Sequence, residues 1–154
     1  MNMRPSVAVV DADDARLLGR FRLLPPVQDE ASWLEEHGPV LGPDPQVNRF
    51  DKPGTTDPHF EVIEVHPESP QLTVASDADV LVALYPVGWS PGGSEQPDVA
   101  VRVPAGYGSI IEPGVWHSGV CALGDSPVVA VFRARTLEDA TEVHHLGQGI
   151  AFVI

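Results

Sequence analysis

The sequence has very little cysteine and few positive charges, and both shortages exclude classes of protein. Its 154 residues include a single cysteine, Cys121, which excludes a disulfide framework within the chain and a cysteine-based zinc cluster. Nine Lys and Arg residues stand against 22 Asp and Glu residues, giving a formal net charge of −13. Because the phosphate backbone of nucleic acid attracts positive charge, this balance argues against a nucleic-acid partner.

Long hydrophobic runs are also missing. The longest apolar segments, such as Val80–Leu84 and Ile150–Ile154, are far too short to span a bilayer. Near the N-terminus, Asp11 and two further aspartates interrupt the apolar stretch Val7–Val10, which is not the pattern of a secretory signal peptide. We therefore expect a soluble cytoplasmic protein without a membrane partner.

Proline and glycine, in contrast, are abundant, with 16 and 14 residues, and the segments between them are short, apolar and rich in valine. Such segments are typical of β-strands bounded by turns. The predicted strands are Val7–Val10, Phe60–His66, Gln71–Ala75, Val80–Tyr85, Val99–Val103, Ser109–Ile111, Val128–Arg133 and Ile150–Ile154. Many short strands without a break in composition predict one all-β domain over residues 1–154, a sandwich or a barrel.

Two short helices are expected at the periphery of this domain. Asp29 is a suitable N-cap for the first helix, and Gly38 ends it. A second helix is predicted after Thr136, where acidic residues suit the positive end of the helix dipole. The segment from Pro39 to Pro58 is expected to be a long ordered connection.

Side chains that could bind a metal or take part in catalysis gather at the end of the strand Phe60–His66. Because side chains alternate between the two faces of a strand, its even-numbered residues are expected on one face, which ends in Glu64 and His66. Gln71 follows a proline-bounded turn, and a tight turn would place it near His66 on the adjacent strand. A second histidine, His117, follows a Pro-Gly turn much later in the chain.

These two segments resemble the paired motifs of the cupin superfamily, in which a His is followed by Glu or Gln and a Gly-rich stretch leads through a Pro/Gly turn to another His. The resemblance implies a small jelly-roll β-barrel that holds a divalent metal. By this resemblance His66, Gln71 and His117 are the metal ligands, and Glu64 stands where the first motif usually has an earlier His. Imidazole and oxygen donors suit nickel, manganese, iron or zinc.

Within the cupins, the stretch from Gln28 to Arg133 resembles ureidoglycolate lyase, an enzyme of purine degradation. The matching motifs are a short helix before Gly38, the pair Asn48-Arg49, the strand end Glu64-Val65-His66-Pro67, the following Gln71, the triplet Val115-Trp116-His117 and a strand that ends in Arg133. Where the family usually has further histidines around the triplet, this chain has Glu112 and Ser118, and Thr73 also departs from the family pattern. These departures lie beside the expected site, so they affect the expected substrate more than the fold.

The resemblance implies a homodimer that cleaves a C–N bond in a small hydroxy-acid adduct and releases urea and glyoxylate. Glu64 or Glu112 would accept the proton of the substrate's hydroxyl group. Arg49 or Arg133 would bind its carboxylate through a planar guanidinium. The expected substrate-binding set also includes Trp116 and Ser118.

Several alternatives stay open at this point. Each arginine serves equally well in a salt bridge to one of the many acids, Gln71 can be a simple turn residue, and residues such as Glu112 and Trp116 are more often a surface charge and a packing residue. The function can also be that of a cupin lyase or isomerase acting on another small carboxylate or sugar acid. A third possibility is a non-catalytic protein that binds a small acid.

Overall fold

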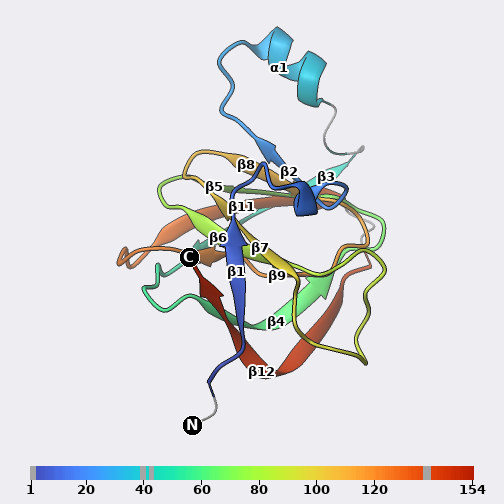
Figure 1. Cartoon of the computed structure of the whole chain (residues 1–154). Coiled ribbons are helices and arrows are strands. Elements are labelled where there is room, and N and C mark those ends of the chain that lie inside the picture. The colour runs from blue at the N-terminus through green and yellow to red at the C-terminus, as the bar shows by residue number, and fades with distance from the viewer. Residues whose placement is uncertain (1–2, 39–40, 42–43, 137–139) are drawn as a thin grey trace.

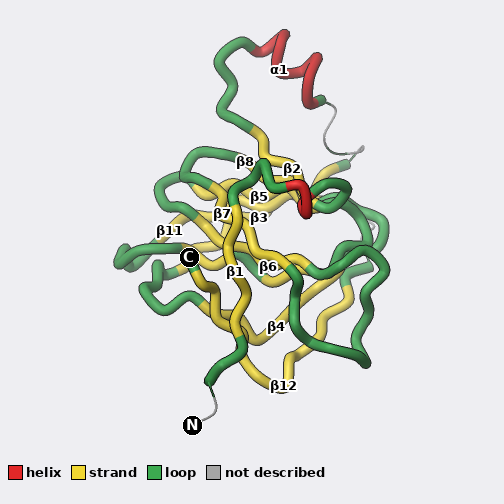
Figure 2. Tube along the Cα trace, in the orientation of Figure 1, coloured by secondary structure: helices red, strands yellow, loops and turns green. Residues whose placement is uncertain are grey.

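The protein is described by a computed structural model that covers residues 3–38, 41, 44–136 and 140–154. Figures 1 and 2 show that strands dominate it, as the sequence predicts. The first sheet has seven strands in the spatial order β10 (Cys121–Ala122), β6 (Val80–Leu84), β7 (Val99–Val103), β1 (Ser6–Val10), β12 (Glu142–Val153), β4 (His59–Val65) and β9 (His117–Ser118). The second has five, in the order β2 (Phe21–Leu24), β8 (Gly108–Ile111), β5 (Gln71–Ala75), β11 (Val129–Thr136) and β3 (Pro45–Lys52).

The seven-stranded sheet closes on itself. β6 pairs with β9 at Leu84 and His117, so the strands β6, β7, β1, β12, β4 and β9 form a closed barrel. The five-stranded sheet lies against one side of this barrel (Figure 1). The whole is the cupin-like jelly roll that the sequence predicts.

Two apolar cores follow from the alternation of side chains along β6. Val82 and Leu84 belong to a cluster that also draws residues from β2, β5, β8 and β11, so this cluster fills the space between the two sheets. Leu81 and Ala83 belong to a second cluster, with residues from β1, β4, β7 and β12, which fills the barrel. A strand that is buried on both faces explains why β6 reads as a continuous apolar run.

The predicted connection between Pro39 and Pro58 is wrong, because part of it forms β3. This strand is the edge of the five-stranded sheet and pairs with β11 along eight residue pairs. Its sequence is polar and its residues are mostly exposed, so periodicity gave no sign of it. Pairing with β11 imposes the extended backbone that composition does not predict.

Several further strands extend beyond or outside the expected segments, among them β9, β10 and the end of β11 at Thr136. β12 begins at Glu142 rather than Ile150, because its polar first half pairs with β4, and β2 has no counterpart among the predicted strands. Phe60 also departs from the expected alternation: it packs with Ile63 and Val65 in the barrel. The partner strand β12 has a register shift opposite this point, between His145 and Ile150.

One predicted helix is confirmed. α1 (Glu30–His37) begins after Asp29, whose carboxylate accepts a hydrogen bond from the backbone N–H of Ser32, and it ends at Gly38. Figure 1 shows α1 standing away from the barrel, and none of its residues is buried. A short 3₁₀ turn, η1 (Ala15–Leu17), precedes β2. The second predicted helix falls on residues 137–139, outside the described residues, and Thr136 ends β11.

The turn after His66 changes sheets. β4 belongs to the barrel and β5 to the five-stranded sheet, so Gln71 is not on the strand adjacent to His66, and that expectation is wrong. Gln71 instead reaches across to His117, on the opposite sheet. Among the described residues, no helix has both the length and the apolar character to cross a membrane.

Candidate metal centre and its cavity

Three potential metal ligands converge on the outer side of the barrel, where it faces the second sheet. Glu64 lies opposite His117 on the paired strands β4 and β9, and His66 follows β4 directly. The Oε1 atom of Glu64 lies 3.4 Å from Nε2 of His66 and 3.5 Å from Nε2 of His117. Two ligands bound at about 2.1 Å to a tetrahedral ion lie about 3.4 Å apart, so this spacing suits one shared ion.

The backbone around His117 orients its ring for such a role. Its Nδ1 atom lies 2.9 Å from the carbonyl oxygen of Val115, to which it donates a hydrogen bond. The proton therefore resides on Nδ1, and the Nε2 lone pair points toward Glu64 and Gln71. Fixing the tautomer through the second ring nitrogen is the usual arrangement of metal-binding histidines.

His66 has two arrangements available. Its Nδ1 atom lies 3.2 Å from Nη1 of Arg135 and 3.0 Å from the hydroxyl oxygen of Thr141. A neutral ring either accepts a hydrogen bond from Arg135 or donates one to Thr141. Only the second arrangement presents an Nε2 lone pair to a metal, so metal binding selects the contact with Thr141.

Gln71 approaches the same cluster from β5. Its amide nitrogen lies 3.3 Å from Nε2 of His117, while its buried Oε1 atom has no hydrogen-bond partner among the described residues. The two ends of an amide exchange places by a half-turn of the side chain. A cation at the cluster would give the turned Oε1 the partner that it lacks, so Glu64, His66, His117 and Gln71 together fit a divalent ion.

The cluster carries a stable negative charge on Glu64. Burial opposes ionisation of this carboxyl, but the neighbouring His117 and His66 outweigh it and hold the pKa of Glu64 well below its usual range. Nη1 of Arg133 lies 3.4 Å from Oε1 of the same carboxylate. The guanidinium of Arg133 also lies over the ring of Phe50, 4.6 Å from its centroid.

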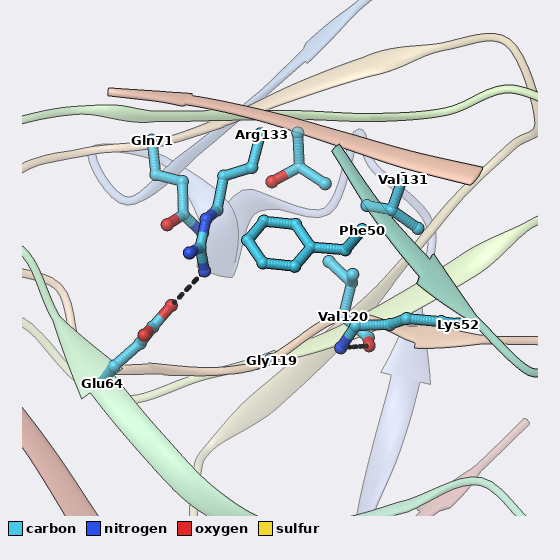
Figure 3. Close-up of a pocket in the computed structure, with 9 residues that line it drawn as sticks. Phe50, Lys52, Glu64, Gln71, Gly119, Val120, Val131 and Arg133 are labelled. Atoms are coloured by element: carbon cyan, nitrogen blue, oxygen red, sulfur yellow. Dashed lines mark hydrogen bonds and ion pairs between the residues drawn. The ribbon is translucent and has the colours of Figure 1, made fainter. Parts of the chain in front are cut away.

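A cavity of about 150 Å³ opens beside the cluster, between the barrel and the second sheet (Figure 3). Its polar walls come from Glu64, from Gln71 and Thr73 on β5, from Arg133 on β11 and from Lys52 on β3. Its apolar walls are Phe50, Val120 and Val131, and Gly119 completes the lining. Glu64, Gln71 and Arg133 thus reach one cavity from three strands of two sheets.

Four expected site residues lie elsewhere. Arg49 projects from the outer face of β3, where it pairs with Asp51 at 3.0 Å, because its neighbours Phe50 and Lys52 take the inner face. Glu112 pairs with Arg22 at 2.9 Å and does not line the cavity.

Trp116 and Ser118 likewise contact the protein's own core and backbone and not the cavity. Trp116 packs in the barrel core, edge-on to Trp89. The hydroxyl of Ser118 accepts a hydrogen bond from the backbone N–H of Ala83 and donates one to the carbonyl of Gly119. Both residues are neighbours of His117 in the chain, and neither lines the cavity.

Sequence reasoning missed Phe50 and Lys52, which line the cavity. The signal for Lys52 was available, since it is the only lysine in the chain. Placing it at the site requires recognising β3 as a strand and knowing which of its faces is inward. Thr73 was identified only as a departure from a family pattern, and the structure places it in the cavity wall.

The fold and the site together define a cupin-like barrel with a cluster of two histidines and a carboxylate. No protein-family model matches the chain. No curated protein matches its sequence either.

Several solved structures resemble part of the chain. Peruvianin-I, a cysteine peptidase from Thevetia peruviana latex, is 15% identical over 67% of this chain and 57% of its own, with a TM-score of 0.48. RmlC from Streptococcus suis, solved with dTDP-D-xylose, is 15% identical over 71% of this chain and 48% of its own, with a TM-score of 0.43. A dTDP sugar isomerase from Desulfovibrio desulfuricans is 19% identical over 72% of this chain and 69% of its own, with a TM-score of 0.48.

At these identities and TM-scores the three proteins carry no argument about function. This chain spans only 57% and 48% of the length of the first two. The barrel and the facing five-stranded sheet show the fold alone. None of these proteins supports the finer resemblance to ureidoglycolate lyase.

Proposed function

We propose that this protein is a metal-dependent enzyme acting on a small carboxylate, and that its reaction is the cleavage of ureidoglycolate to urea and glyoxylate. The observation that supports the first part is the convergence of Glu64, His66 and His117 beside a cavity that Arg133 also lines. The second part rests on the sequence resemblance in the motifs around Glu64, His66 and His117.

The residues divide into a metal-binding group and a carboxylate-binding group. Glu64, His66, His117 and Gln71 would hold nickel, manganese, iron or zinc, and a bound divalent ion acidifies a hydroxyl group beside it. Arg133 is the cation that can bind the substrate carboxylate with two parallel hydrogen bonds.

The reaction breaks the bond between the hydroxyl-bearing carbon and the ureido nitrogen. The hydroxyl oxygen becomes the aldehyde oxygen of glyoxylate, its proton leaves, and the nitrogen gains a proton to give urea. Of Glu64 and Glu112, only Glu64 lines the cavity, so Glu64 would be the carboxylate that accepts the hydroxyl proton.

The size of the cavity favours a small acid. A cavity of about 150 Å³ suits a ligand about as large as benzene. A hydroxy acid of a few carbon atoms approaches this size, whereas a nucleotide sugar is several times larger. The walls of Phe50, Val120 and Val131 also make this side of the cavity apolar.

The test is urea and glyoxylate release from ureidoglycolate by tag-free protein supplied with each of the four metals. We expect turnover by the wild type, loss of turnover in His117→Ala and Arg133→Met, and near-normal turnover in Arg49→Met and Glu112→Gln. A folded, metal-loaded protein that releases no urea would refute the lyase. Binding of a small acid without turnover would then favour the non-catalytic alternative, and turnover of another small acid the altered-substrate enzyme.

We also propose a homodimer. The outer face of the five-stranded sheet exposes Val47 and Phe132, whose exposed fractions are 63% and 41%. Leu72 and Val74 adjoin them in an apolar depression. Light scattering should give a mass of two chains, and Phe132→Glu should give one chain if this face forms the interface.

A further inference from the structure

Lys52 lines the cavity but has no role in the proposed reaction. It is the last residue of β3 and points inward, and its Nζ atom donates a hydrogen bond to the carbonyl oxygen of Val120 at 3.0 Å. An ammonium group carries three donors, so this contact leaves two for other acceptors. In Figure 3 Lys52 and Glu64 lie on opposite sides of the cavity, and the ring of Phe50 lies between Lys52 and the Arg133 guanidinium.

Among the described residues that line the cavity, no second carboxylate is present to match the charge of Lys52. The lining contains two cations, Lys52 and Arg133, and one carboxylate, Glu64. Arg133 and both histidines already contact Glu64 within 3.5 Å. The wall of the cavity is therefore positive, in a chain whose formal net charge is −13.

The environment of Lys52 is also unfavourable for its own charge. Burial lowers the pKa of Lys52 and is the largest effect; the charge of Cys121 opposes it, the charge of Arg133 lowers the pKa further, and the charge of Glu64 raises it. An anionic or carbonyl oxygen placed beside Nζ would relieve this penalty, since it offers the ammonium the partner that water provides outside.

We propose that Lys52 is a specificity-determining residue that binds a second oxygen acceptor of the ligand, at the end of the cavity away from Glu64 and Arg133. The ligand class is then a small hydroxy acid with two acceptor ends: a carboxylate on Arg133 and a further carboxylate or carbonyl on Lys52. The inference deepens the proposed function and rests on it for the role of Arg133. In ureidoglycolate the second acceptor is the ureido carbonyl.

The probe is a matched pair of hydroxy acids, glycolate and tartronate, which differ by one carboxylate. Calorimetric titration of the purified protein, with its metal content measured, should show tighter binding of tartronate. A charge-assisted hydrogen bond to a carboxylate corresponds to about a ten- to hundredfold preference. Lys52→Met should abolish most of this preference and leave glycolate affinity unchanged.

Controls separate this role from a general loss of structure or charge. Arg49→Met removes a cation from the outer face of the same strand and should keep the tartronate preference. Lys52→Gln still reaches toward Val120 as a neutral donor, so it serves as the test variant if Lys52→Met does not fold. Thermal unfolding of every variant establishes that it is folded.

The outcomes are distinct. Equal affinity of the wild type for the two acids, absence of tartronate binding, or an unchanged preference in the folded Lys52 variant would each overturn the inference. An equal loss of affinity for both acids would also overturn it, because Lys52 would then not distinguish the second acceptor. A tartronate preference that depends on Lys52, together with no urea release, would keep the inference and refute the lyase.

Discussion

Arg133 and Arg49 lie on the neighbouring strands β11 and β3, and they can be compared directly because Arg133 points into the cavity and Arg49 points away from it. Each lies near a carboxylate and a phenylalanine ring: Arg133 contacts Glu64 and Phe50, and Arg49 contacts Asp51 and Phe132. The side chains of Arg133 and Glu64 are 23% and 18% exposed, whereas those of Arg49 and Asp51 are 57% and 55% exposed. The same substitution to methionine therefore removes a shielded interaction in one case and a solvated one in the other.

For Arg133→Met we expect the free energy of unfolding of the metal-free protein to fall by about 1–3 kcal/mol, from a cation–π contact and a long charge-assisted hydrogen bond. Each kcal/mol corresponds to about 2–4 °C in Tm for a chain of this size. For Arg49→Met, an exposed pair predicts a loss below about 0.5 kcal/mol. Urea unfolding measures both, and equal losses in the two variants would refute the assignment of Arg133 to a shielded cavity.

Two further predictions concern residues outside the cavity. Ser118→Ala should lower the free energy of unfolding by about 1–3 kcal/mol, because it leaves the buried N–H of Ala83 without its acceptor. Urea unfolding should show this loss, and metal analysis should show an unchanged metal content. A variant that loses metal would contradict the purely structural role of Ser118. The backbone N–H of Ala105 and the Arg102 guanidinium lower the pKa of Asp79. The charge of Asp79 therefore contributes its full stability above the unfolded-state pKa of about 3.9, and this contribution disappears as the pH falls through the lower folded-state pKa. Asp79→Asn should therefore have a lower free energy of unfolding than the wild type at pH 7, and the difference should narrow in acid. A difference in unfolding free energy that stays constant down to pH 2 would contradict this.

The sequence predicts the fold well where burial follows a simple rule. β5 and β7 have the predicted bounds, because turn residues border them: Pro70 and Ser76-Asp77 for β5, and Pro97 and Pro104 for β7. β3 could not be found in this way, since an edge strand with exposed polar residues obtains its hydrogen bonds from β11 and not from its own composition. Long-range pairing of this kind leaves no local pattern.

The same limit explains the site. Glu64 and His66 share a face over two residues of one strand, so local alternation places them together, and His117 was brought in by its motif. Gln71 reaches the cluster from the opposite sheet and not from the adjacent strand, which no local argument predicts. Arg49 and Arg133 were equivalent in sequence, and only the inner and outer faces of β3 and β11 distinguish them.

The central claim is that Glu64, His66 and His117 hold one divalent metal ion. The most direct measurement is elemental analysis of tag-free protein after incubation with the four metals and removal of the excess by gel filtration. The wild type should retain about one equivalent of a divalent metal, His117→Ala should lose most of it, and His144→Ala should keep it, because His144 lies away from the cluster and pairs with Glu95. Equal metal content in the wild type and His117→Ala, with both proteins folded, would contradict the account.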